Sequence, residues 1–459
     1  MADSILQAEL VQNSGDFKHV TAVTTPQGYA LLTTPGNSVG MRTMVDLDST
    51  SMYPVPAYHQ SLFGGLKTFN QYRLGDYVNC NGIDASLYAP AITAGGGAVV
   101  AVPLQSAISL TVGVANADRA FLFTKTQHRY QAGRQQSVTA SVIHDDLGRA
   151  NQTRRWPYFD ANDGLFFALV GTVLNVVVRS SVTGVVVDVP VPQSAWNVDR
   201  LNPAFGLNPS GVTLDITKGS IYEIKFQWLG VGDVFFFVNG ILVHHVFNDN
   251  ALSVPYMRCP TLPLAFEVVN TAGSAAGGMR FVCGTVSSDG GEAPPQEQGS
   301  YRRAAQTVAA NSEAYAFSIR LSRFYPKAGA IQNRGQVQPR LLSLASETNR
   351  ASIRLLLNPV LTGATFAIDP GADIAVDVDQ AATVVTGGTE LVNFFAPSQG
   401  VGGAAITIDL SSMFQHNDRP LRRWSTVAAD ADILTVMYSN EQNGTTDLSA
   451  VLTWLETTG

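Results

Sequence analysis

The chain has 459 residues, of which 45% are hydrophobic and only 14% are charged, and its net charge at pH 7 is −7. This length predicts two or three domains. The acidic balance argues against a nucleic-acid-binding protein, which needs a basic face. Because so few residues are charged, we expect much of the surface to be covered by other protein subunits.

The three cysteines, Cys80, Cys259 and Cys283, have no spacing typical of a metal site or of a disulfide-rich secreted domain. The first residues lack a secretory signal pattern, and the apolar runs are far shorter than the ~20 residues of a membrane span. We therefore expect synthesis in a reducing cytoplasm, with no cofactor, no metal and no membrane contact.

The pattern of apolar and turn residues divides the chain into four parts. Residues 1–105 contain short apolar pieces separated by Gly, Pro and Asn, which indicate an irregular N-terminal arm or a small β-domain. Residues 106–286 contain short strand patterns at regular spacing, which predict a jelly-roll β-sandwich. Residues 287–300 have almost no apolar side chain and predict a flexible linker. Strand patterns resume over 301–459 and predict a second β-sandwich, so the fold class is all-β.

A hairpin is the clearest local prediction. Two apolar runs flank Asn239-Gly240, a pair typical of a type I′ turn because both positions need a positive φ. A two-residue loop places Phe235 opposite His244. Because both faces of the hairpin are apolar, we expect it to be a central pair of strands, covered on both sides.

Two groups of polar residues invite a metal-site interpretation. His244 and His245 are neighbours on a predicted strand and point to opposite faces, so they cannot chelate one ion together. The segment 160–164, Asp-Ala-Asn-Asp-Gly, resembles the start of a calcium loop, but no acidic residue occupies the twelfth position. We interpret the histidines as structural and the segment as a turn.

The carboxylates provide little support for catalysis. Glu223 and Glu267 are the two glutamates between residues 106 and 286, and their spacing does not place them on one strand face. A glycoside hydrolase that uses this pair of carboxylates is kept as a minor hypothesis. We predict that the protein is not an enzyme and assign no catalytic residue.

Two Arg-Arg-Trp triplets are candidates for intermolecular contacts, because arginine and tryptophan are enriched at interface hot spots. The alternative interpretation of each triplet is a solvated turn beside one buried indole ring. The residues are Arg154, Arg155, Trp156, Arg422, Arg423 and Trp424.

Between residues 127 and 291, several runs resemble in the same order a pattern of tailed-bacteriophage virion structural proteins that have a concanavalin-like jelly roll. These runs are Tyr130–Gly133, Arg154–Phe167, Val178–Ser181, Gln193–Asn197, Leu214-Asp215, Phe226–Gly232, Tyr256-Met257, Leu262–Leu264 and Phe266-Glu267.

The resemblance implies a structural virion component that is made in the cytoplasm of a bacterial host and contacts capsid or tail subunits. We predict a capsid-surface decoration or cement protein that forms a homo-oligomer, with a trimer favoured. The alternative is a tail, baseplate or fibre component that binds a receptor or a glycan. In that case Trp196 and Tyr256 are the expected glycan-contact aromatics.

Overall fold

The computed structural model describes residues 71–459 except 291–296, 372–373, 397–404, 415–419 and 458–459, together with four strands within the first 70 residues. Residues Met1–Asn70 form one compact unit and Gln71–Gly459 another. In the first unit the four strands pair in order as an antiparallel sheet. They are β1 (Ile5–Val11), β2 (Phe17–Thr24), β3 (Tyr29–Thr33) and β4 (Met44–Asp46).

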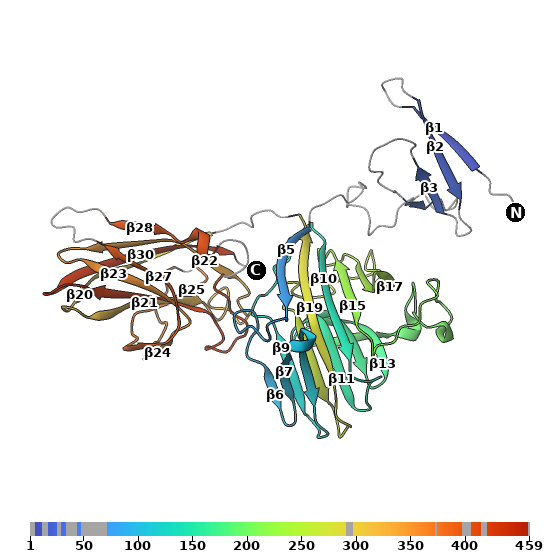
Figure 1. Cartoon of the computed structure of the whole chain (residues 1–459), viewed down its shortest axis with the longest axis horizontal. Coiled ribbons are helices and arrows are strands. Elements are labelled where there is room, and N and C mark those ends of the chain that lie inside the picture. The colour runs from blue at the N-terminus through green and yellow to red at the C-terminus, as the bar shows by residue number, and fades with distance from the viewer. Residues whose placement is uncertain are drawn as a thin grey trace. The chain divides into compact units, whose positions relative to one another are not determined.

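The second unit begins with a jelly roll of two antiparallel sheets (Figure 1). Sheet I has the order β17 (Ile241–Val246), β16 (Val234–Val238), β15 (Ser220–Phe226), β10 (Gln136–His144), β19 (Gly277–Asp289), β8 (Ala107–Val112) and β7 (Ala98–Val102), and β5 (Gln71–Val78) also pairs with β19. Sheet II has the order β14 (Val187–Pro192), β13 (Val173–Ser180), β12 (Gly164–Val170), β11 (Gln152–Phe159), β18 (Ala265–Asn270), β9 (Arg119–Phe123) and β6 (Ile92–Ala94).

Alternation along the strands explains how the core forms. On β15, Tyr222, Ile224 and Phe226 are fully buried between the two sheets, whereas Glu223 and Lys225 point outward. Successive side chains of a strand point to opposite faces. The two sheets therefore bury one apolar face each against the other and leave their outward faces free to carry polar residues.

The jelly roll extends beyond the predicted limits at both ends. β5, β6 and β7 all precede residue 106 and belong to its sheets. Gly95–Gly97 interrupt the apolar pattern between β6 and β7 and hide these short strands in the sequence. At the other end β19 continues to Asp289 and β20 begins at Glu297, so strands occupy part of the predicted linker; its residues 291–296 lie outside the described part of the chain.

The predicted hairpin is present as β16 and β17, and Asn239 and Gly240 have φ values of 50° and 80°. Two details of its prediction are wrong. A β-bulge shifts the register after Phe236, so that His244 lies opposite Phe236 and not Phe235. The hairpin also forms the edge of sheet I and not its centre.

A loop protects this edge from pairing with another chain. The side chain of Asn197 accepts a hydrogen bond from the backbone N–H of His245 at 2.9 Å and donates one to the backbone carbonyl of His245 at 2.8 Å. The N–H and carbonyl groups of His245 are therefore already hydrogen-bonded and cannot pair with a further strand at this edge.

The C-terminal sandwich also has two main sheets. The first has the order β20 (Glu297–Val308), β30 (Thr446–Thr457), β22 (Gln336–Ser346) and β28 (Ile406–Asp409). The second has the order β25 (Val376–Asp379), β21 (Glu313–Leu321), β29 (Ile433–Asn440), β23 (Ala351–Leu357) and β27 (Thr389–Ala396). A separate small sheet pairs β24 (Val360–Thr362) with β26 (Val384–Thr386). Trp454, Phe317 and Tyr438 lie in the core between the two main sheets.

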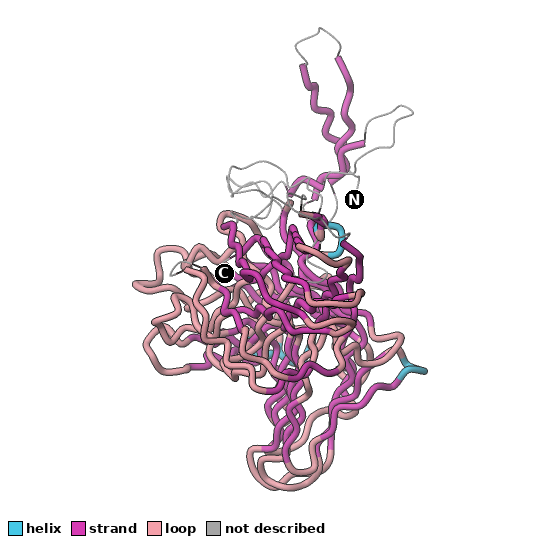
Figure 2. The backbone as a smooth tube through the Cα atoms, turned by 90° about the vertical axis from the view of Figure 1, so that its left-hand side faces the viewer, coloured by secondary structure: helices cyan, strands magenta, loops and turns pink. Residues whose placement is uncertain are grey.

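Helical residues are few (Figure 2). The described helices are single 3-10 turns: η2 (Pro103–Gln105), η3 (Gln193–Ala195), η4 (Pro203–Phe205) and η5 (Ser411–Met413). In the described part of the chain no helix is long and apolar enough to cross a membrane. The predicted all-β class, with a jelly roll and a second β-sandwich, is confirmed.

Candidate functional site

The outward face of sheet II carries a charged cluster near its middle. In the sheet register, Arg155 of β11 lies opposite Glu267 of β18, and Glu267 lies opposite Phe121 of β9. The sequence neighbours Trp156 and Phe266 are buried in the core between the sheets. Because side chains alternate along a strand, Arg155, Glu267 and Phe121 share the face that points away from the core.

Glu267 binds two arginine side chains on this face. Its Oε1 lies 2.6 Å from Nε of Arg119, and its Oε2 lies 2.5 Å from Nη1 of Arg155. The exposed fraction of the side chain is 7% for Glu267, 21% for Arg155 and 36% for Arg119. We call this group the Arg119–Glu267–Arg155 cluster. Two cations share one anion in it, so the cluster carries one uncompensated positive charge.

Both arginines have N–H donors that do not bind Glu267. A guanidinium carries five N–H donors in a planar fork that matches a carboxylate. In the contacts of the described residues, each arginine uses one nitrogen on Glu267. The guanidinium carbon of Arg119 also lies 4.8 Å from the ring centroid of Phe121. The cluster can therefore bind an anionic group beside a partly exposed aromatic surface.

Apolar side chains occupy the rest of this face, and the C-terminal sandwich covers part of them. Trp424 of the C-terminal sandwich packs against these apolar side chains. Nζ of Lys125 lies 4.5 Å from the ring centroid of Trp424. Burial lowers the pKa of the Lys125 amine. The carboxylate of Asp432, 3.9 Å from Nζ, partly offsets this lowering. The apolar group consists of Ala89, Phe123, Phe159, Phe166, Ala168, Val177 and Ala265, with Phe121 at its margin.

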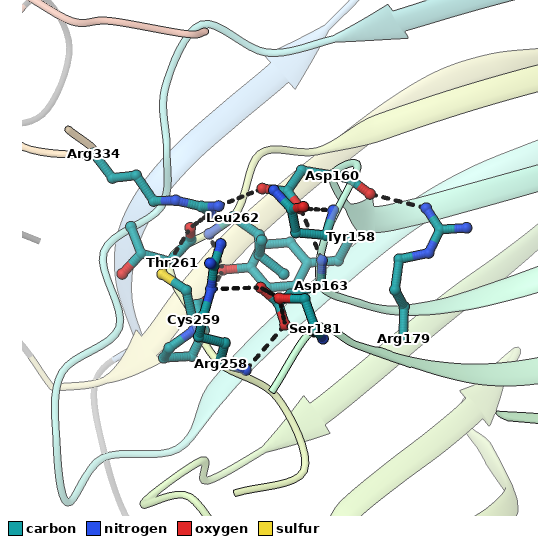
Figure 3. Close-up of polar contacts among 12 residues, drawn as sticks. Tyr158, Asp160, Asp163, Arg179, Ser181, Arg258, Cys259, Thr261, Leu262 and Arg334 are labelled. Carbon is teal, nitrogen blue, oxygen red and sulfur yellow. Dashed lines mark hydrogen bonds and ion pairs between the residues drawn. The ribbon is translucent and has the colours of Figure 1, made fainter. Parts of the chain in front are cut away.

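The segment 160–164 is a turn between β11 and β12 (Figure 3). Oδ1 of Asp160 accepts hydrogen bonds from the backbone N–H groups of Asn162 and Asp163 at 2.7 and 2.9 Å. The buried carboxylate of Asp163 accepts bonds from the backbone N–H groups of Ser181 and Arg258. These contacts confirm the interpretation as a turn. Within the described ranges, no group of three or more His, Cys, Asp or Glu side chains is placed to hold a metal ion.

Arg334 of the C-terminal sandwich reaches the same turn (Figure 3). Its Nη1 lies 2.5 Å from the carbonyl oxygen of Thr261, and its Nη2 contacts the carboxylate of Asp160. The side chain is almost fully buried. A buried ion pair therefore joins the two sandwiches within the chain.

The first Arg-Arg-Trp triplet is largely inaccessible to a partner. Trp156 is fully buried and lies 4.6 Å, between ring centroids, from His144 in the core. Arg154 is buried as well, and its Nη2 lies 2.7 Å from Asp146. The central position of β11 in sheet II explains this burial. Arg155 alone in this triplet points to the outward face, where it belongs to the cluster described above.

The second triplet makes contacts inside the chain. Arg422 is buried; its Nη1 donates to Thr126 at 3.2 Å and its Nη2 to the carbonyl of Ser86 at 2.7 Å, so it binds the jelly roll. Arg423 is buried within the C-terminal sandwich. These side chains, together with Trp424, therefore pack within the molecule, and the prediction that they contact another molecule is corrected.

The predicted glycan-contact aromatics are also corrected. Trp196 and Tyr256 both belong to the buried core of the jelly roll, and Nε1 of Trp196 donates to the carbonyl of Val191 at 3.2 Å. Loops rich in Asn and Pro surround both residues in the sequence, which suggests exposure. Large rings in such loops serve here as anchors that fix the loops to the core.

Glu223 and Glu267, the two carboxylates of the glycoside hydrolase hypothesis, lie on different sheets. Glu223 points outward from sheet I, where Ser137 donates to it at 2.8 Å, whereas Glu267 points outward from sheet II. The sandwich core lies between them, so they cannot flank one glycosidic bond. His244 accepts a hydrogen bond from the N–H of Asn197, and His245 lies 2.7 Å from Asp233, which agrees with structural roles.

Arg119 and Phe121 are residues of the candidate site that the sequence pattern does not indicate. Both are separated from Arg155 by more than 30 positions, and Arg119 is separated from Glu267 by 148. Only the strand order of sheet II brings these residues together. The available signal was the alternation in Arg119–Phe123, which puts Arg119 and Phe121 on one strand face.

No family model matches the chain, and neither does any curated protein. Similar solved structures include an endo-β-1,4-glucuronan lyase from the fungus Trichoderma reesei, with 12% identity over 47% of this chain and 95% of that chain and a TM-score of 0.32. An endo-1,3-β-glucanase from Streptomyces sioyaensis has 9% identity over 48% and 96%, with a TM-score of 0.34. The Emp46p carbohydrate recognition domain has 9% identity over 47% and 97%, with a TM-score of 0.28.

These comparisons correct one prediction directly. The similar structures are mostly lyases and glucanases, which contradicts the prediction that the chain is not an enzyme. Another similar structure is described as belonging to endo-acting O-glycanases that initiate mucin breakdown, with 13% identity over 47% of this chain and 98% of that chain and a TM-score of 0.34. No family model supports the resemblance to phage virion proteins.

Proposed function

We propose that the jelly roll recognises an acidic glycan through the Arg119–Glu267–Arg155 cluster. The observation that carries the proposal is that two partly exposed guanidinium groups share one nearly buried carboxylate. Glu267 holds both side chains in place, and the remaining N–H donors face the outside of sheet II. The ring of Phe121 beside them offers an apolar surface for the face of a sugar.

A uronate-containing polymer matches this chemistry better than a neutral one. A carboxylate on the sugar accepts charge-assisted hydrogen bonds from the guanidinium forks, which a hydroxyl group cannot replace at equal strength. A single exposed ion pair contributes only about 0–1 kcal/mol. A polymer with one acid group in each sugar compensates for this weakness, because it presents many equivalent binding positions to the same cluster.

In the organism, we propose that this glycan lies on a host surface and that the chain is a tail, baseplate or fibre component of a virion. Support comes from the runs between residues 127 and 291 that resemble phage virion proteins. Binding of a surface polysaccharide by a jelly roll suits a part of the particle that meets the host.

The test uses the full chain and three polysaccharides: a polyuronate, the same polymer after chemical reduction of its carboxylates to alcohols, and a neutral glucan. We expect binding to the polyuronate and loss of binding on carboxylate reduction. The length of each polymer is followed in parallel, so that cleavage is detected if it accompanies binding. Equal binding to all three polymers, or binding to none, would overturn the proposal.

A further inference from the structure

Arg320 and Arg423 approach one loop of the C-terminal sandwich from two different segments. Arg320 lies on β21, and its Nη1 donates to the carbonyl of Ala428 at 3.1 Å. Arg423 donates through Nη1 to the carbonyl of Val427 at 2.8 Å and through Nε to the carbonyl of Leu321 at 3.0 Å. The two guanidinium groups thus bind consecutive carbonyl groups, which places two cations close together.

Both arginines keep a buried donor that has no partner in the described part of the chain. The atoms are Nη2 of Arg423 and Nε of Arg320. Arg423 is only 1% exposed. Across the same described residues, no ion pair joins either arginine to a carboxylate. A buried cation without a counter-ion is costly, so this arrangement calls for an anion.

The neighbouring acidic residues have other partners. Asp377 accepts a hydrogen bond from Ser322 at 2.7 Å and lies 3.8 Å from Nζ of Lys327. Asp430 accepts one from Ser425 at 2.5 Å. Burial, followed by the charge of Arg320, lowers the pKa of Arg423 to about 10. Asp377 and Asp430 oppose this lowering of the pKa but form no ion pair with Arg423 in the described part of the chain.

Phe366 holds the guanidinium of Arg320 in a fixed plane. The guanidinium carbon lies 3.8 Å from the ring centroid of Phe366. The backbone of Phe366 has a φ of 48°, a strained conformation for a bulky residue. Asp379 stabilises it by accepting the N–H groups of Thr365 and Phe366 at 2.7 and 3.2 Å. Backbone strain of this kind is concentrated at ligand-binding sites.

We propose that Arg320 and Arg423 form a binding site for a tetrahedral oxoanion, either phosphate or sulfate. The four oxygens of such an ion point in different directions, so they can accept hydrogen bonds from both guanidinium groups. An ion with up to two negative charges also balances the two positive charges. The side chain of Arg320 as a whole is half-buried, whereas its Nε and Nη2 of Arg423 are enclosed by protein. The site lies in the C-terminal sandwich and is independent of the proposed glycan site.

The first test is thermal unfolding of the full chain in low millimolar phosphate or sulfate, with chloride at equal ionic strength as the reference. We expect the Tm of the native chain to rise by about 2 °C or more. Sulfate and phosphate at high concentration stabilise proteins by exclusion from the surface, which is why low concentrations are used. Arg423→Met should lose the rise. Arg354→Gln should keep it, because Arg354 has two carboxylate partners, Glu313 and Glu390, in the same sandwich.

Calorimetric titration with inorganic phosphate and with methyl phosphate provides the second test. Binding of one ion per chain, weakened at least about tenfold in Arg320→Gln, would support the proposal. Equal binding of methyl phosphate would show that an ester group of a larger ligand also fits; binding of the free ion alone would indicate an enclosed structural ion. An identical Tm in phosphate, sulfate and chloride, together with no heat of binding, would overturn the proposal. So would an unchanged response in Arg423→Met.

Discussion

Nε2 of His128 lies 2.9 Å from the hydroxyl of Tyr77 in the core of the jelly roll. Nδ1 of the same imidazole lies 3.0 Å from the carbonyl oxygen of Leu262. A carbonyl only accepts, so Nδ1 carries a proton. Burial lowers the pKa of His128 to about 4, so the ring is neutral near pH 7 and Nε2 then accepts from the Tyr77 hydroxyl.

This neutral histidine predicts that acid destabilises the protein. The pKa of an unfolded histidine is about 6.5, so between pH 6.5 and 4 the unfolded state binds the proton that the folded state excludes. The contribution of His128 to the free energy of unfolding should be complete above pH 6.5. It should decrease by roughly 3 kcal/mol as the pH decreases to 4. Burial lowers the pKa of His144 to about 3, which acts in the same direction.

Urea unfolding at several pH values between 7.5 and 4.5 measures this effect. His128→Gln should lower stability at pH 7.5 and reduce the dependence on pH. A free energy of unfolding that stays constant over this range in the native chain would contradict the assignment of a neutral, buried His128.

Gly75 provides a second prediction about the same hydrogen bond. A Cβ at this position would lie 2.8 Å from Nε2 of His128 and 3.0 Å from the Tyr77 hydroxyl. Gly75→Ala should therefore cost about 2 kcal/mol through overpacking. Gly219→Ala is the matched control, because its added Cβ would meet only Ile143 at 3.5 Å, an ordinary contact. Similar unfolding midpoints for the two variants would rule out the crowding inferred at Gly75.

The contact of Arg334 with Asp160 predicts coupling between the two sandwiches. Arg334→Met removes a buried charge that also binds the carbonyl of Thr261, and should destabilise the chain by about 3 kcal/mol. Arg354→Met removes two partly exposed ion pairs, with Glu313 and Glu390, and should cost only about 1 kcal/mol. Calorimetry of both variants checks the difference. Equal costs would mean that the Arg334 contact contributes no more than a surface pair.

The sequence was sufficient for strands in which the alternation is local. Tyr222, Ile224 and Phe226 show their common face without any tertiary information, and Asn239-Gly240 shows its turn. The bulge after Phe236 was not predictable, because it depends on how the edge strand twists against its neighbour.

The burial of charged residues could not be predicted from the sequence. Arginine is usually exposed, so the sequence indicates exposure for Arg154 and Arg422. In the structure both are buried, because Asp146 accepts a hydrogen bond from Arg154, and Thr126 and Ser86 accept hydrogen bonds from Arg422. These partners come from other segments of the chain. The same reason hid the Arg119–Glu267–Arg155 cluster, whose members lie on three strands that only the sheet order makes adjacent.

The most direct test of the proposed function is the affinity of the native chain and of Arg155→Gln for one uronate oligosaccharide, measured by calorimetry. Arg155→Gln removes the guanidinium charge, keeps a shorter polar side chain and leaves Glu267 paired with Arg119. We predict binding that is weaker by about tenfold, or about 1.4 kcal/mol, while Arg354→Gln binds like the native chain. Equal affinity of Arg155→Gln and the native chain would contradict recognition by this cluster.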